Sequence, residues 1–97
     1  MYLAKVIGRV VATTKDMSLS GSKLLIITRL NEQLEPQDRT EIAVDTVGAG
    51  NGETVIVTSG SASRLAGTLQ KSVVDASIVG IVDTVETDGG VRDVRHP

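Results

Sequence analysis

Runs of apolar, β-branched residues alternate with polar loops along this chain. The first run, residues 3–14, has a period of two, which is typical of a β-strand. One face is small or apolar throughout and is expected to face the core; its residues are Ala4, Val6, Gly8, Val10 and Ala12. The other face mixes Lys5 and Arg9 with Leu, Ile and Val, so a protein partner explains it better than water does. Gly8 in mid-strand predicts a sharp bend.

Similar runs predict further strands over residues 23–30, 40–45, 53–59, 76–86 and 91–94. The segments 15–22 and 31–39 are polar loops, Gly80 marks a second bend, and Asp88-Gly89-Gly90 predicts a hairpin turn. Residues 61–66 predict one or two helical turns, with Ser61 as N-cap and Gly67 as stop. This pattern favours a mainly β, OB-like five-stranded barrel with one short helix and a C-terminal hairpin strand, in one domain over residues 1–97.

Composition adds two constraints. The 97 residues include one Tyr, no Phe and no Trp, so the core lacks the large buried area that aromatic rings contribute. An isolated domain of this size is then expected to be marginally stable, and oligomerisation is a common way to stabilise it. The absence of Cys excludes disulfides and thiolate metal sites. The amino terminus lacks a signal-peptide pattern, and no run approaches the ~20 apolar residues of a membrane span. We therefore expect a cytoplasmic protein with no membrane partner.

The run Asp45-Thr46-Val47-Gly48-Ala49-Gly50-Asn51-Gly52 places three glycines in five positions between two strands. Glycine lets a backbone approach something closely, either a ligand or a second copy of the chain. A nucleotide-binding glycine loop opens a helix, whereas this run precedes a strand and lacks the Lys-Ser/Thr pair of a P-loop. A structural turn is the better interpretation.

Catalytic chemistry finds little support. Ser59, Ser61 and Ser63 lack a base, because the one histidine, His96, is next to last. The acids Asp45, Asp75, Asp83 and Glu86 are scattered and lack the spacing of a calcium loop. They are better interpreted as turn caps or as partners of arginine, with Arg64 the natural one to test. We expect no enzyme activity, no metal and no cofactor.

Nucleic-acid binding is the first function that an OB-type barrel suggests. Such proteins combine a positive groove with aromatic rings on which bases stack. This chain has a net charge of −2, dispersed basic residues and a single Tyr at position 2. The composition therefore disfavours a nucleic-acid partner, although the fold permits one.

Several blocks together resemble one family. They are Met1-Tyr-Leu-Ala-Lys-Val-Ile-Gly-Arg-Val-Val-Ala-Thr, Leu19-Ser-Gly-Ser-Lys23, Asp45-Thr-Val-Gly-Ala-Gly50, Gly60-Ser-Ala-Ser-Arg64 and Val74-Asp75 with Ile81-Val82-Asp83-Thr-Val85. In order and at these distances, they resemble the EutN/CcmL family of bacterial microcompartment vertex proteins. The family usually has Pro before the Val-Asp pair, where this chain has Val73. The difference affects the local linker or the subfamily.

This resemblance implies a structural shell protein whose pentamers cap the vertices of a shell with hexameric facets. It implies two sets of candidate residues: Gly48, Ala49, Gly50 and Asn51 at or near the central opening, and Arg64 with Asp83 bracing a subunit contact. Two alternatives remain open. One is an OB-type binding module for single-stranded nucleic acid or a small ligand, and the other is a small subunit of an enzyme complex.

Overall fold

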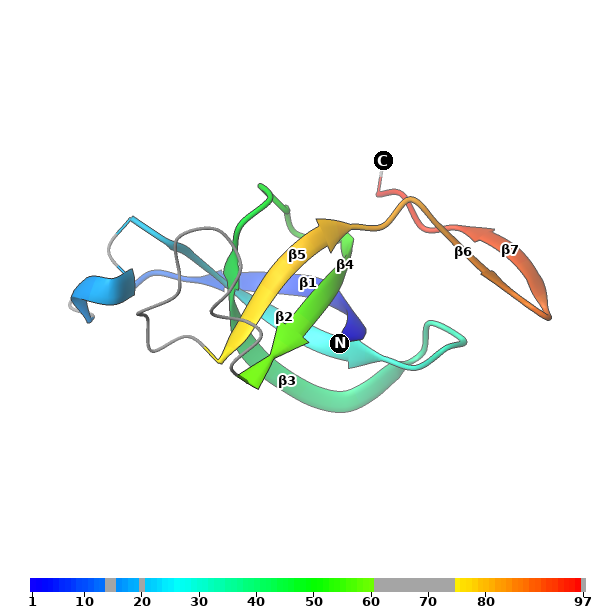
Figure 1. Ribbon diagram of the computed structural model, residues 1–97, viewed down its shortest axis with the longest axis horizontal. Coiled ribbons are helices and arrows are strands. Elements are labelled where there is room, and N and C mark those ends of the chain that lie inside the picture. Colours follow the sequence, from blue (N-terminus) through cyan, green and yellow to red (C-terminus); the bar gives the residue numbers. More distant parts are fainter. Residues whose placement is uncertain (14–15, 20, 61–74, 97) are drawn as a thin grey trace.

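Five strands of the chain close into a β-barrel (Figure 1). The computed structural model describes residues 1–13, 16–19, 21–60 and 75–96. The barrel strands are β1 (Tyr2–Val10), β2 (Lys23–Leu30), β3 (Pro36–Asp45), β4 (Thr54–Ser59) and β5 (Ala76–Ile81). Their order around the barrel is β1-β2-β3-β5-β4, with β3 and β5 parallel and the other neighbours antiparallel. The predicted OB-like five-stranded barrel is confirmed.

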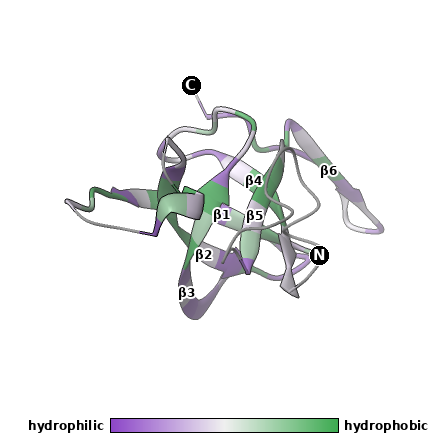
Figure 2. Cartoon of the chain, turned by 60° about the vertical axis from the view of Figure 1, so that its left-hand side comes forward, coloured by the Kyte–Doolittle hydropathy of each residue, from purple (hydrophilic) through white to green (hydrophobic). Residues whose placement is uncertain are grey.

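The barrel interior is filled by small and β-branched side chains. Its fully buried residues are Ala4, Val6, Leu25, Ile27, Ala43, Ala49, Val55, Val57, Ala76 and Ile78. Tyr2, the one aromatic residue, packs against this cluster while remaining partly exposed. Figure 2 shows the apolar residues concentrated along the barrel strands, with hydrophilic residues where β3 bends outward. The core thus derives its stability from close packing of many small groups.

Both glycines predicted to bend strands lie at β-bulges. Val6 pairs with Ile27 and Gly8 with Ile26, so Ile7 is an extra residue on β1. A similar shift lies between β4 and β5, where Gly80 pairs with Ile56. A Cβ on Gly80 would lie 3.3 Å from Ile56 Cδ1, which explains why a side chain is disfavoured there. Bulges of this kind increase local twist and help a small sheet to close.

Several predicted boundaries are wrong. The predicted strand 76–86 is split into β5 and β6 (Thr84–Thr87). The Val82 N–H still donates to the Thr54 carbonyl oxygen at 2.9 Å, but β4 begins at Thr54, so the chain has no further partner strand there and leaves the barrel. β3 begins at Pro36 rather than residue 40, and β1 ends at Val10 rather than residue 14. The polar loop 15–22 contains an unpredicted 3-10 helix, η1 (Met17–Leu19). The predicted helical turns over 61–66 lie outside the described residues.

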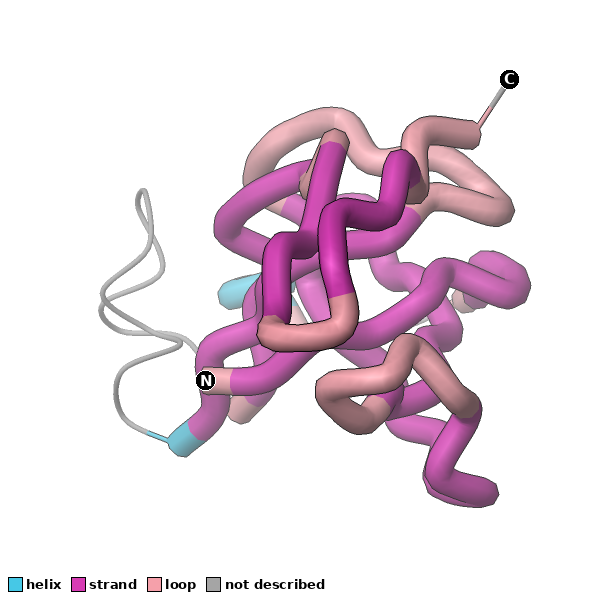
Figure 3. The backbone as a smooth tube through the Cα atoms, turned by 90° about the vertical axis from the view of Figure 1, so that its right-hand side faces the viewer, coloured by secondary structure: helices cyan, strands magenta, loops and turns pink. Residues whose placement is uncertain are grey.

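The last two strands form a hairpin that stands away from the barrel in Figure 1 and faces the viewer in Figure 3. β6 pairs with β7 (Gly90–Asp93) across the predicted turn at Asp88 and Gly89. We call residues 84–93 the arm. The arm lies at one end of a molecule measuring 44 × 24 × 23 Å. It therefore presents a large surface for its small number of residues.

Candidate functional site

Two carboxylates fix the two ends of the glycine loop between β3 and β4. Asp45 Oδ1 accepts the N–H groups of Val47 at 3.0 Å and Gly48 at 3.1 Å. At the other end, Glu53 Oε1 accepts the N–H of Gly50 at 2.6 Å. The interpretation of Asp45 as a turn-capping residue is confirmed. The loop consequently has a defined shape although it carries few side chains.

A lysine from β2 ties the middle of this loop to the barrel. Lys23 Nζ donates to the carbonyl oxygen of Ala49 at 2.7 Å and lies 3.8 Å from Asp45 Oδ2. The Asp45 side chain is 1 % exposed, so the lysine supplies a nearby positive charge to a carboxylate largely withdrawn from water. No local pattern indicates this contact, because Lys23 is 26 residues from Ala49 in the sequence.

The candidate residues of the loop occupy different environments. Ala49 is fully buried in the barrel core, Gly50 is half-buried, and Gly48 and Asn51 are exposed. Gly48 has φ = +80°, a conformation that favours glycine. The exposed backbone of this loop, rather than the Ala49 side chain, is thus what a neighbour can contact.

The C-terminal segment packs against the end of the loop. Gly52 has φ = +88° and donates its N–H to the Val6 carbonyl oxygen at 2.8 Å. A Cβ at this position would lie 2.7–2.9 Å from ring atoms of His96. Gly52 therefore allows both the left-handed backbone and the close approach of the imidazole ring.

The two remaining candidate residues are not brought together by the described structure. Asp83 is exposed and lies where the chain passes from the barrel to the arm, with its carbonyl oxygen accepting the N–H of Val94 at 2.9 Å. Arg64 lies outside the described residues. The expected contact between these side chains and a neighbouring subunit stays a prediction.

Apolar side chains are exposed on several elements outside the core. The large ones are Met1, Ile7, Val11, Met17, Ile42, Val47, Ile81 and Val91. Ile42 borders a groove of about 280 Å³ on the outside of the barrel, next to Leu19 and Leu24. The groove with Ile42 at its border is therefore a candidate contact surface for another protein chain.

The rim of the barrel carries a compact polar cluster. The Arg29 guanidinium lies 3.7 Å from the centre of the Tyr2 ring, and the Tyr2 hydroxyl donates to Glu41. Burial, reinforced by this hydrogen bond, raises the pKa of Tyr2 to about 12. Arg29 covers one face of the Tyr2 ring, so that face of the one aromatic residue is not free to stack on a base.

The described residues show no arrangement suited to catalysis by a metal. In the ranges 1–13, 16–19, 21–60 and 75–96, no three His, Asp or Glu side chains gather closely enough to hold an ion. β4 follows the glycine loop directly, in agreement with a structural turn rather than a nucleotide site. Within the same ranges no helix has the length and apolar character needed to cross a bilayer.

A family model decides what this barrel is related to. The model described as "Ethanolamine utilisation protein EutN/carboxysome" matches residues 1–83, which is most of the chain. The chain belongs to the EutN/CcmL family. The match ends where β6 begins, so it covers the barrel and not the arm.

Relatives of this EutN/CcmL chain are shell vertex proteins. The bacterial microcompartment shell vertex protein GrpN of Rhodospirillum rubrum is 61 % identical over 87 residues, which are 90 % of this chain and 98 % of GrpN. The carboxysome shell vertex protein CcmL of Synechocystis is 46 % identical over 90 residues, 93 % of this chain and 90 % of CcmL. These are structural components, so the EutN/CcmL chain is a structural protein of a microcompartment shell and not an enzyme.

Solved structures agree with this family assignment. A carboxysome subunit CcmL superposes with a TM-score of 0.93 at 44 % identity, covering 98 % of this chain and 100 % of that one. The structure described as the GrpN pentameric microcompartment shell protein from Rhodospirillum rubrum superposes with a TM-score of 0.83 at 61 % identity, covering 90 % and 99 %. The EutN/CcmL barrel and its arm therefore have close structural counterparts.

Proposed function

We propose that this EutN/CcmL chain assembles into a homopentamer that closes a vertex of a microcompartment shell. The observation that carries the proposal is the 61 % identity to GrpN, whose structure is described as pentameric. The exposed apolar residues support it, since Ile7, Ile42 and Val91 come from three different elements and provide more than one contact patch. A ring needs such patches, because each subunit meets its two neighbours through different surfaces.

The glycine loop is proposed to face the centre of this ring. Gly48, Ala49, Gly50 and Asn51 would lie at or near the opening, where backbones from five copies must come close. The fixed shape of the loop supports this role, because Asp45, Lys23 and Glu53 order it before any partner arrives. Asp83 and Arg64 are proposed to brace the contact between neighbouring subunits.

Hexameric shell proteins of the same microcompartment are the proposed partners of the assembled ring. Five copies carry a formal charge of 5 × (−2) = −10, which supports solubility of the free ring. The rim of the ring would then contact the hexamers that form the facets of the shell. Neither nucleic acid nor a cofactor is needed for this role.

The first test is the native mass of the purified full chain, measured by native mass spectrometry at several concentrations. A pentamer has a mass of 5 × 10.1 = 50.5 kDa. A species that stays at 10.1 kDa at every concentration would overturn the proposal and favour the ligand-binding module. A salt-dependent shift with a single-stranded oligonucleotide would then identify nucleic acid as the ligand.

The role of the loop is tested with Gly50→Val. A Cβ here lies 3.4 Å from Glu53 Oε1, so the variant adds bulk at the proposed opening while the loop relaxes only slightly. We expect loss of the 50.5 kDa species. Glu53→Gln is the matched control, because its amide oxygen still accepts the Gly50 N–H. An unaltered Gly50→Val oligomer would exclude a tightly packed loop at the ring centre.

The partner is tested by co-expression with hexameric shell proteins from the same microcompartment. Electron microscopy of the purified particles should show this chain at five-fold positions of closed shells. A chain that never co-purifies with shells, although it forms the ring, would refute the proposed hexamer contact.

A further inference from the structure

A pocket of about 340 Å³ lies where the arm meets the barrel, and we call it the arm pocket. Its walls come from β1, from the segment that joins β2 to β3, from the start of β4, and from β7 with the residues that follow it. The charged side chains of its lining are exposed, so the pocket is open to solvent. All of its walls belong to one chain, so the arm pocket exists without a second copy.

The lining of the arm pocket has an excess of positive charge. Its three cations, Lys5, Arg92 and Arg95, outnumber its one carboxylate, so the charges sum to +3 − 1 = +2, although the whole chain carries −2. The carboxylate is that of Asp93, which already pairs with Arg95 at 2.6 Å. The hydrogen bond to Asp93, with a smaller contribution from the charge of Asp83, raises the pKa of Arg95. None of the ion pairs between described residues involves Lys5 or Arg92, so these two cations have no counter-charge from the described part of the chain.

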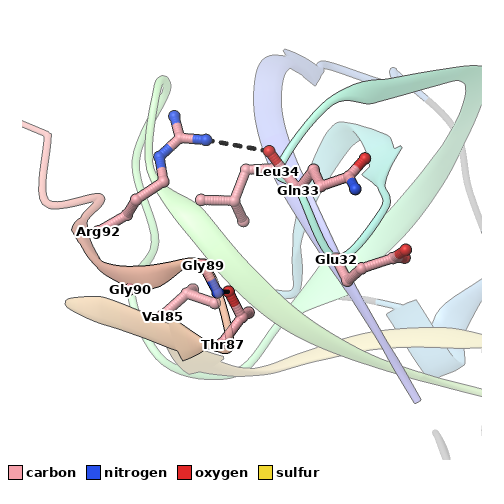
Figure 4. Close-up of a pocket in the computed structure, with 8 residues that line it drawn as sticks. All are labelled: Glu32, Gln33, Leu34, Val85, Thr87, Gly89, Gly90 and Arg92. Atoms are coloured by element: carbon pink, nitrogen blue, oxygen red, sulfur yellow. Dashed lines mark hydrogen bonds between the residues drawn. The ribbon is translucent and has the colours of Figure 1, made fainter.

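The turn between β2 and β3 holds the guanidinium of Arg92 in place (Figure 4). Arg92 Nη1 donates to the carbonyl oxygen of Gln33 at 3.0 Å. Arg92 lines a smaller pocket beside Leu34 as well as the arm pocket, so its guanidinium lies between the two. Glu32 lines the smaller pocket too, but it forms no ion pair among the described residues. Of the five N–H groups of the guanidinium, only the one on Gln33 has a partner in the described structure, and the others are left for a ligand.

Lys5 approaches the arm pocket from the outer face of the barrel. It pairs with Thr28 on β2 and with Thr54 on β4, whereas the next residue, Val6, is fully buried in the core. Side chains directly opposite each other on adjacent strands lie on the same face of a sheet. Both flanking threonines are short, so the longer lysine side chain extends past them into the pocket that it lines.

His96 adds an imidazole ring to the same pocket. A Cβ on Gly52 would lie 2.7–2.9 Å from three ring atoms that include both nitrogens, so the ring packs against the backbone of this glycine. A neutral imidazole carries one N–H donor. Lys5, Arg92 and His96 thus bring donors from β1, β7 and the C-terminal segment to one pocket.

We propose that the arm pocket binds a small dianionic oxyanion, namely a phosphate group. Lys5 and Arg92 supply the two positive charges that balance a dianion. The remaining N–H groups of Arg92 and the N–H of His96 donate hydrogen bonds to its oxygens, and such charge-assisted bonds are among the stronger ones in proteins. Because Lys5 belongs to β1 and Arg92 to β7, the bound anion joins the arm to the barrel. The proposal does not rest on the proposed ring, since one chain provides all of these groups.

The rest of the lining bears on which molecules carry this phosphate group. Leu30, Leu34 and Pro36 form an apolar side of the same pocket. An apolar wall accepts the carbon part of a phosphate ester, whereas inorganic phosphate needs only the polar groups. One probe of each kind therefore distinguishes the two sources of the ligand.

The test is isothermal titration calorimetry of the full chain with inorganic phosphate. The titration is made at about pH 8, where a phosphate group is mainly a dianion, and chloride keeps the ionic strength constant. We expect saturable binding with one site per chain. Lys5→Ala and Arg92→Gln should each weaken this binding by about tenfold, because each removes a charge-assisted contact. Arg9→Ala is the matched control, since it removes an exposed cation of β1 that does not line the pocket, and it should change the affinity by less than about twofold.

The one histidine of the chain reports where the anion binds. Phosphate should shift the proton NMR signal of the His96 ring with the same midpoint as in calorimetry, and chloride at equal ionic strength should not. Phenyl phosphate is titrated in the same way. Binding at least about threefold tighter than that of inorganic phosphate identifies the phosphate group of an organic molecule as the ligand, and equal or weaker binding identifies free phosphate.

Three results would overturn the anion site. They are the absence of saturable binding up to about 50 mM phosphate, an equal loss of affinity in Arg9→Ala and Lys5→Ala, and binding that leaves the His96 signal unmoved. Should Arg92→Gln fail to fold by circular dichroism, Lys5→Ala carries the test, because this exposed lysine has no ion pair to lose among the described residues.

Native mass spectrometry of the same samples separates this proposal from the proposed function. A chain that binds phosphate but stays monomeric overturns the ring alone. A pentamer that binds no phosphate overturns the anion site alone.

Discussion

Replacing Asp45 tests whether its carboxylate shapes the glycine loop. In Asp45→Ala, the N–H groups of Val47 and Gly48 lose their acceptor. Hydrogen bonds to a charged group contribute about 1.5–3 kcal/mol each. Both residues are exposed, so water partly replaces the acceptor and the lower end applies. The pair with Lys23, at 3.8 Å and with the lysine 45 % exposed, adds less than about 1 kcal/mol.

We therefore expect Asp45→Ala to lower the free energy of unfolding by about 3 kcal/mol, a large part of the roughly 5–15 kcal/mol typical of a domain of this size. Urea denaturation, followed by circular dichroism at one protomer concentration, should show a midpoint lower by about 2 M. The concentration is fixed because assembly contributes to the apparent stability.

Asp45→Asn is the matched control. Its amide oxygen still accepts both N–H groups, so the loss should be about 1 kcal/mol, from the weakened pair with Lys23 and the missing charge. Equal losses in the two variants would show that the charge matters and the backbone hydrogen bonds do not. An Asp45→Ala loss below about 0.5 kcal/mol would refute the argument that this side chain holds the loop.

Three further outcomes follow from single features. In the folded protein the absorbance change of Tyr2 at 295 nm should have its midpoint near the raised pKa of about 12, against about 10 in denaturant. The stabilisation from the neutral phenol is therefore complete below pH 10 and is lost as the pH rises toward 12; a folded-state midpoint near 10 would contradict the burial of the hydroxyl. Gly48→Ala should lower the free energy of unfolding by about 1–2 kcal/mol, because the residue has a left-handed backbone. Gly52→Ala should lower it further, because the added methyl group displaces the His96 ring. In urea titrations this difference should disappear when both variants also carry His96→Ala. Because the Ile27 side chain is fully buried, Ile27→Ala should lower the free energy of unfolding by about 2–5 kcal/mol and Ile27→Val by about 0.5–1.5 kcal/mol. Equal losses for the two variants in thermal unfolding would argue against close packing around this side chain.

The parts of the fold that follow from local chemistry were predictable. Alternation correctly placed Ala4 and Val6 in the core, and glycine in mid-strand marked the bulges at Gly8 and Gly80. The same alternation was wrong for Ala12, which is exposed, because the bulge at Ile7 interrupts the period of two. The end of β5 was not predictable, because apolar residues continue through Val82 and the strand ends where its partner β4 begins, at Thr54. Hydrophobic periodicity is read over a short window of sequence, so it does not reveal a contact between segments as distant in sequence as β4 and β5.

The candidate site shows the same division. Asp45 capping a glycine turn is a local pattern and could be predicted. The burial of Ala49 and its contact with Lys23 depend on how β2 lies beside the loop, which the sequence does not specify locally. The arm was predicted only as a hairpin, since its separation from the barrel depends on the turn at Val82 and Asp83.

Because the arm adds no fully buried residue to the barrel core, its exposed residues can vary at little cost to the folding of the barrel. The family model ends before β6, and the fully buried residues all precede it. Substitutions at exposed residues of the arm are therefore expected to change the surface of the molecule while every subunit keeps the same barrel. Two chains can therefore share this barrel and still present different surfaces through residues 84–93.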